Sequence, residues 1–184
     1  VAIAAEVRNA LDCPFCAKRK QALSPYTLAG EHHSDGQLDA RVVDAVHRVV
    51  TDQSRITRAW IEENAADGLS EEHYAELLGI VVTVFSIDEF NRALGMAPEP
   101  LPKPVAGEPD HYRPSRVEYG NGFIPMLRAD GAVGKESDLW PAGANSNVLR
   151  ALSLVPDAVR CWRDVSNVQY LPFDRSEERR GVKA

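Results

Sequence analysis

The sequence is poor in cysteine and in basic charge, and it contains no long apolar run. Three cysteines in 184 residues, an odd number, do not fit the framework of a small disulfide-stabilised secreted domain. A net charge of −6 argues against nucleic acid or an anionic membrane as the partner. No uninterrupted apolar stretch approaches the ~20 residues that a membrane span needs. We therefore expect a soluble, cytoplasmic protein that binds neither nucleic acid nor membrane.

Signatures of bound cofactors are also missing. The glycines fit neither the GxGxxG pattern nor the spacing of a phosphate-binding loop, and no metal-binding helix motif is present. The composition is globular, with 44% hydrophobic and 26% charged residues, and the chain is long enough to bury a real core. We expect a folded protein without a cofactor or a metal.

Helical spacing of apolar residues dominates the first half of the chain. Helices are predicted over 1–11, from Pro14 to about Leu23, and from Leu38 onward. Thr51-Asp52 can cap a further helix, and Ser70 is a good cap for the longest one, which runs to about residue 94 and stops at glycine.

The second half begins with many prolines, which exclude a helix or a central strand, and then returns to helix. A short helix is predicted after Asn145 or Ser146, and another begins at Pro156. The fold class is therefore all-α. The chain divides into a helical core over 1–95, a proline-rich linker over 96–119 and a helical segment over 120–184.

The motif Cys13-Pro14-Phe15-Cys16 carries the clearest chemistry. Proline favours the first helical position, so Cys13 is expected at the N-cap and Cys16 in the first turn. The free N–H groups and the dipole of a helix start stabilise an anion and so lower the pKa of a thiol. The cationic run 18–20 acts in the same direction. Because this spacing also lets two sulfurs form a disulfide, the motif predicts thiol–disulfide redox chemistry.

Other interpretations of the pair remain open. A structural zinc site needs four ligands, and only His32 and His33 lie nearby in the sequence. The cysteines could also be inert, because free cysteine often acts as a small core residue. A thioredoxin-type domain would need a β-strand before the motif, where the sequence predicts a helix.

The helical CxxC turn, the two helices after it and the segment SEEHYAELLGIVVTVFSIDEFNRALG resemble the alkylhydroperoxidase D-like family, which includes the carboxymuconolactone decarboxylase-like proteins. The similarity is clearest from Ala10 to Gly95. The later segment NGFIPMLRADGAVGKESDLWPAGANSNVLRALSLVPDAVRCWRDVSNVQYLP resembles the portion that usually precedes the CxxC helix in that family. The resemblance implies an all-α bundle that assembles into dimers, trimers or larger rings.

The resemblance also implies an activity. Cys16 would attack a hydroperoxide as a thiolate and become a sulfenic acid, Cys13 would condense with it to a disulfide, and an external thiol would restore the dithiol. Helix geometry alone favours Cys13 as the more exposed nucleophile, whereas the family order favours Cys16. The expected substrate is a small hydroperoxide or a disulfide.

The chain departs from the family pattern at the proton relay. The family has a histidine four residues after the second cysteine, where this chain has Lys20, and a glutamate at or before the position of Val1. Lys20 can stabilise a thiolate but is a poor proton shuttle at its ordinary pKa. Glu6 is the nearby carboxylate, and His32 or His33 could replace the histidine. The candidate catalytic residues are Cys13, Cys16, Lys20, His32, His33 and Glu6.

The two segments that resemble the family occur in reversed order. Either the chain is a fragment of a tandem-domain protein, or the C-terminal helices pack on the bundle of their own chain or of a neighbouring copy. In the second case the proline linker would connect the exchanged parts.

Two further functions stay open. One is a lyase that acts on a small carboxylated lactone, with His32, His33 or Tyr74 transferring protons and the cysteines only structural. The other is a non-catalytic helical assembly protein that has lost the proton relay.

Overall fold

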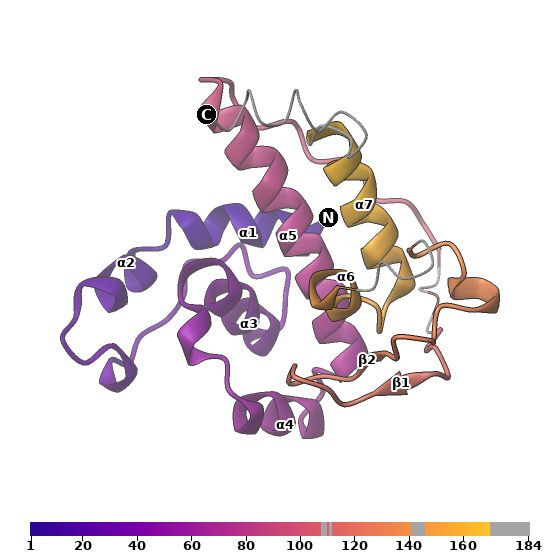
Figure 1. Cartoon of the computed structure of the whole chain (residues 1–184). Helices are drawn as coiled ribbons and strands as arrows, with labels where there is room; N and C mark the ends of the chain where they lie inside the picture. The colour runs from indigo at the N-terminus through magenta and orange to yellow at the C-terminus, as the bar shows by residue number, and fades with distance from the viewer. Residues whose placement is uncertain (108–109, 111, 141–145, 170–184) are drawn as a thin grey trace, which may run out of the picture.

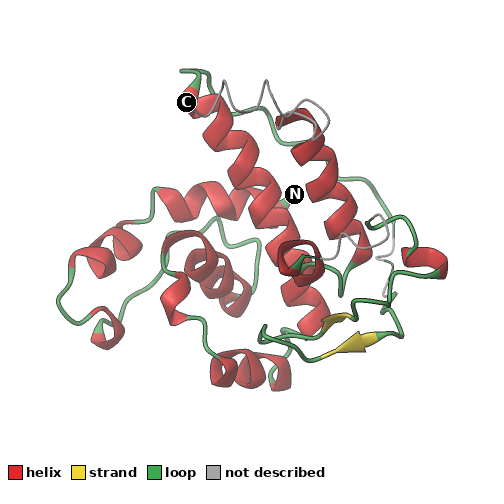
Figure 2. Cartoon of the chain, in the orientation of Figure 1, coloured by secondary structure: helices red, strands yellow, loops and turns green. Residues whose placement is uncertain are grey.

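The fold is known from a computed structural model, which describes residues 1–107, 110, 112–140 and 146–169 (Figure 1). The described residues form seven α-helices, three short 3₁₀ turns and one two-stranded hairpin, which confirms the all-α prediction (Figure 2). The helices are α1 (Ala2–Leu11), α2 (Pro14–Gln21), α3 (Ala40–Thr51), α4 (Arg58–Ala66), α5 (Glu71–Ala93), α6 (Asn147–Ala151) and α7 (Pro156–Gln169). The strands are β1 (Val117–Glu118) and β2 (Met126–Leu127).

Helix α5 is the central element of the fold, and α1, α3 and α7 pack against it (Figure 1). Its start is the predicted one, because the Ser70 hydroxyl accepts a hydrogen bond from the backbone N–H of His73 at 3.3 Å. Gly95 follows its end with a φ of 71°, a left-handed conformation that glycine adopts without steric cost. Leu77 and Val81 in its middle are buried in the main core. Both predicted ends of the longest helix are confirmed.

Helix α3 turns an apolar face that includes Val46 and Val49 into the same core. The expected helix start at Thr51-Asp52 is wrong, because Thr51 is the last residue of α3. Its hydroxyl donates to the His47 carbonyl at 2.6 Å, so it closes the preceding helix and does not cap a new one. The next helix, α4, begins after Thr57, whose hydroxyl accepts from the following turn.

Helix α7, the last helix of the described residues, lies along α5 of the same chain (Figure 1). The two backbones approach closely at Gly79, where an added Cβ would lie 2.5 Å from the Cβ of Ala158. The hairpin pairs Val117 with Leu127, and the Leu127 N–H donates to the buried Ser153 hydroxyl at 2.8 Å. The later segment therefore packs on the helical core within one chain.

The proline-rich stretch between α5 and β1 contains neither helix nor strand in those of its residues that the structure describes. None of the helices in the described ranges combines the length and the apolar composition that crossing a bilayer requires.

Candidate redox site at Cys13 and Cys16

The cysteine pair lies at the start of α2, as the sequence predicts. Cys13 is the N-cap and Pro14 the first helical residue, and the helix α1 precedes the motif. The Cys13 carbonyl accepts the Ala17 N–H at 3.0 Å, which fixes the first turn. Both side chains are buried, with Cys13 1% and Cys16 5% exposed. Their chemistry therefore depends on the groups packed around the sulfurs.

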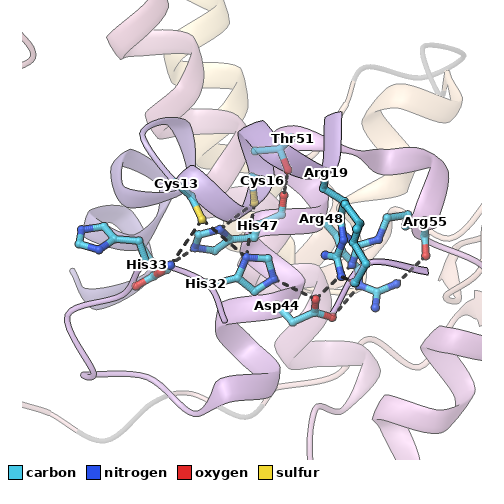
Figure 3. A network of polar contacts seen from close by, with 12 residues as sticks. Cys13, Cys16, Arg19, His32, His33, Asp44, His47, Arg48, Thr51 and Arg55 are labelled. Atoms are coloured by element: carbon cyan, nitrogen blue, oxygen red, sulfur yellow. Dashed lines mark hydrogen bonds and ion pairs between the residues drawn. The ribbon is translucent and has the colours of Figure 1, made fainter. Parts of the chain in front are cut away.

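Two histidines contact the sulfur of Cys16 (Figure 3). The Cys16 Sγ lies 3.4 Å from Nδ1 of His32 and 3.3 Å from Nδ1 of His47. His32 Nδ1 is also 3.9 Å from the Cys13 Sγ, which in addition accepts the backbone N–H of His33 at 3.4 Å. The two imidazoles lie against one another, with ring centroids 4.2 Å apart. A negative charge on the Cys16 sulfur is thus better stabilised by these contacts than one on the Cys13 sulfur.

Each imidazole contacts a carboxylate through its other nitrogen. His47 Nε2 lies 2.8 Å from Oε1 of Glu6, and His32 Nε2 lies 3.2 Å from Oδ1 of Asp44. Glu6 is 2% exposed, and its second oxygen accepts the Ser34 hydroxyl at 2.8 Å. Each histidine therefore presents Nδ1 to sulfur and Nε2 to a carboxylate.

Asp44 is held in place by two guanidinium groups. It accepts from Arg48 at 2.6 Å and from the buried Arg55 at 3.2 Å. Although burial raises the pKa of Asp44, its hydrogen bond with His32 and the two arginines hold that pKa well below its usual range. Asp44 is a fixed anion next to His32.

The contacts favour a thiolate at Cys16. Burial opposes ionisation, but hydrogen bonds from His32, His47 and Thr51 outweigh it and lower the pKa of Cys16 to about 5. For Cys13, burial is likewise outweighed, here by backbone N–H groups of His33 and Cys16, and its pKa is lowered.

The histidines respond in the opposite direction. Burial lowers the pKa of His32, but Asp44 and the two sulfurs overcome this effect and raise that pKa to about 10. The pKa of His47 is also raised, because contacts with Cys16 and Glu6 outweigh its burial and the charge of His32. These shifts favour an ionised Cys16 sulfur beside protonated imidazoles, each with a carboxylate behind it.

The structure brings four of the six sequence candidates together and leaves two side chains outside. Cys13, Cys16, His32 and Glu6 belong to the cluster. The ring of His33 is directed away from the sulfurs, and only its backbone N–H takes part (Figure 3). Lys20 lies exposed in the last turn of α2, where its strongly hydrated ammonium stays in solvent.

Sequence reasoning missed His47 and Asp44. His47 is completely buried on the apolar face of α3, between Val46 and Val49. A histidine at a core position needs a polar partner, so its place on the apolar face of α3 could have marked His47 as a candidate site residue. Nothing in the sequence indicates which residue supplies the partner.

The two cysteines and the two histidines of the cluster also have the ligand composition of a metal site. One ligand atom each from Cys13, Cys16, His32 and His47 lies within 4.8 Å of all the others. The sequence places only His32 and His33 near the cysteines as possible zinc ligands. In the structure the fourth possible ligand is His47, not His33.

A large cavity of about 950 Å³ lies elsewhere, between α5, α7, the start of α1 and the proline-rich stretch. Ile80, Val84 and Leu101 are among its apolar lining residues, and neither Cys13 nor Cys16 lines it. The cavity is therefore separate from the sulfur chemistry.

Comparison with known proteins adds no relative to this description. No protein-family model, no curated protein and no solved structure matches this chain.

Proposed function

We propose that this chain is a thiol-dependent reductase of small hydroperoxides or disulfides, of the alkylhydroperoxidase D-like class, with Cys16 attacking and Cys13 resolving. One observation carries the proposal. The Cys16 sulfur lies 3.3–3.4 Å from two imidazole nitrogens, and each imidazole is backed by a carboxylate. This arrangement supplies both a stabilised nucleophile and a nearby proton donor.

The reaction proceeds in three balanced steps. The Cys16 thiolate attacks the distal oxygen of ROOH, the O–O bond breaks, and the departing alkoxide takes a proton to leave as ROH. The resulting Cys16 sulfenic acid reacts with the Cys13 thiol to form the disulfide and release water. Two external thiols then reduce the disulfide by exchange and leave as their own disulfide. The peroxide gains the two electrons that these thiols lose.

The proton relay that the family resemblance requires can be formed by histidines and carboxylates at positions other than those of the family pattern. His47 and His32 each place an N–H beside the attacking sulfur, so either imidazolium can protonate the leaving oxygen. Glu6 then stabilises the proton on His47, and Asp44 does so for His32. Lys20 is not needed in this scheme.

The surroundings of the sulfur favour a small substrate. Cys16 is only 5% exposed. The ring of Phe15 lies edge-on to that of His32, with ring centroids 5.3 Å apart. The Arg19 guanidinium stacks on the Phe15 ring, 4.3 Å from its centroid. With so little of the sulfur exposed, a bulky organic peroxide would need neighbouring side chains to move further than a small one would. The regenerating partner is an external thiol, and the family resemblance implies a homo-oligomer.

The two alternatives receive less support. Of the candidate proton-transfer groups of a lactone lyase, Tyr74 is 5% exposed and lies edge-on against Trp60, His32 contacts both sulfurs, and the exposed ring of His33 is directed away from the cluster. Burial raises the pKa of Tyr74 to about 12, which makes it a poor acid. The non-catalytic assembly protein does not by itself explain why two buried imidazole–carboxylate pairs lie beside the sulfurs.

The test uses the Cys161→Ser protein, because Cys161 is an exposed third thiol on α7. After reduction, one equivalent of hydroperoxide should remove two thiols per chain and form the Cys13–Cys16 disulfide. Cys13→Ser should stop at a sulfenic acid that a dimedone-type reagent traps, and Cys16→Ser should not react. Two intact thiols after excess peroxide at neutral pH would refute the proposal.

A further inference from the structure

Three of the distances among the four ligand atoms of the cluster are close to the edge length of a tetrahedral metal site. Zinc binds cysteine sulfur at about 2.3 Å and histidine nitrogen at about 2.0–2.1 Å, so the sulfur–nitrogen edge of a tetrahedral site is about 3.5 Å. The corresponding distances here are 3.3 Å from Cys16 to His47, 3.4 Å from Cys16 to His32 and 3.9 Å from Cys13 to His32. All four atoms lie within 4.8 Å of one another. Because the widest separation can exceed a tetrahedral edge by about 1 Å, side-chain shifts of up to about an ångström would complete the geometry.

The orientation of the two histidines is the second observation. Ligating histidines typically use one ring nitrogen for the metal and donate the other N–H to a carboxylate. Both imidazoles already do this, since each Nδ1 faces the sulfurs and the Nε2 atoms contact Asp44 and Glu6. Asp44 is fixed further by Arg48 and Arg55. The outer shell of a metal site is therefore already built.

The charges also allow a divalent cation. When the imidazoles are protonated at Nδ1, those protons lie between the nitrogens and Cys16, in the space that a metal ion would take. A cation there would release these protons and replace them with a double positive charge between two thiolates. The imidazoles would become neutral ligands and keep their Nε2–H contacts with the carboxylates. No new charge has to be buried without a partner.

We infer that Cys13, Cys16, His32 and His47 bind one Zn²⁺ ion per chain in tetrahedral geometry. A tetrahedral set of two sulfur and two nitrogen donors is typical of zinc. The ion engages both sulfurs, so it also holds the dithiol unreactive toward peroxide until it is removed. This second part, inhibition by the metal, rests on the proposed function; the binding of the metal does not.

The binding test uses reduced, chelator-treated Cys161→Ser protein titrated with Co²⁺ and then with Zn²⁺. We expect the visible absorption of tetrahedral cobalt with thiolate ligands, saturation at one equivalent, and loss of the signal when Zn²⁺ displaces the cobalt. His47→Asn should abolish the signal, and the matched variant His73→Asn, at an exposed histidine of α5, should retain it. Protein oxidised to the Cys13–Cys16 disulfide should give no cobalt signal, because its sulfurs are no longer available.

A second variant guards against misfolding of His47→Asn. Glu6→Gln keeps the ligand set and removes only the carboxylate behind His47, and changes of this kind weaken metal binding by roughly 10- to 100-fold. Circular dichroism of the metal-free variants shows whether each is folded. A Glu6→Gln protein that is folded and binds Zn²⁺ as tightly as the parent would contradict the inferred geometry.

The peroxide reaction separates the two hypotheses. Zinc-loaded protein should lose its thiols much more slowly than metal-free protein, and a chelator should restore the faster rate. If metal-free protein reacts with peroxide but retains neither Co²⁺ nor Zn²⁺, the metal inference is wrong and the proposed function stands. If one Zn²⁺ binds and the metal-free protein is inert toward peroxide, the zinc site is supported and the proposed function is wrong.

Discussion

Replacing His32 with asparagine tests the electrostatic basis of the site. His32 is the only side chain that contacts both sulfurs of the pair, among the residues that the structure describes. Asparagine is polar and of similar size, but it carries no charge. We expect His32→Asn to raise the pKa of Cys16 and leave the fold intact.

The magnitude follows from the type of contact. A hydrogen bond to a charged group contributes about 1.5–3 kcal/mol, and one pKa unit corresponds to about 1.4 kcal/mol. The pKa of Cys16 should therefore rise from about 5 to about 6–7. Because the thiolate forms as the pH rises through this pKa, the variant should lose reactivity mainly on the acid side. At pH 5.5 the thiolate fraction falls roughly 3- to 25-fold, while near pH 8 it changes little.

The assay follows the alkylation of Cys16 by iodoacetamide as a function of pH. Reduced, chelator-treated protein in the Cys161→Ser background keeps metal and the exposed thiol out of the measurement, and mass spectrometry separates Cys16 from Cys13. His73→Asn serves as the control and should give the parental curve. Superimposable curves for His32→Asn and the parent would show that His32 does not stabilise the thiolate.

Three further substitutions test other contacts. Asp44→Asn removes the carboxylate that holds the proton on His32, so the pKa of that imidazole should fall from about 10 by roughly one to two units in an NMR titration. Gly79→Ala places a Cβ 2.5 Å from that of Ala158. Crowding of this kind costs about 1–3 kcal/mol of stability, which the higher helix propensity of alanine partly offsets. Calorimetry should therefore show a Tm lower by roughly 2–8 °C. An unchanged Tm would mean that α7 does not pack closely on α5. Ser153→Ala leaves the buried N–H of Leu127 without its acceptor and should lower the free energy of unfolding by about 1–3 kcal/mol in a urea titration.

The features that the sequence predicts well are those set by neighbouring residues. Pro14 marks the start of α2, and Ser70 and Gly95 mark the ends of α5, because caps and fixed φ angles act within one turn. The place of Cys13 at a helix start was predictable for the same reason. Thr51 shows the limit of this reasoning, since the same hydroxyl can cap a new helix or close the previous one.

The parts of the site that depend on tertiary packing were not predictable. Glu6 and His47 are 41 residues apart in the sequence, and Cys16 and His47 are 31 apart. Their contact arises because α1, α2 and α3 pack together, which no local pattern encodes. Which of His32 and His33 reaches the sulfurs likewise depends on how the loop before α3 lies against α2, which no local pattern encodes.

The stretch from Gly30 to Gln37 belongs to no helix or strand, yet it supplies His32, the His33 N–H and Ser34 to the cluster. Two of these three attachments end on a sulfur atom. Converting the thiols to a disulfide would remove the anion that holds them and leave the backbone here tied through Ser34 and through the contact of His32 with Asp44. Oxidised molecules should then be cut by proteases at this stretch sooner than reduced ones, so the lifetime of the polypeptide itself would depend on how much oxidant it has met.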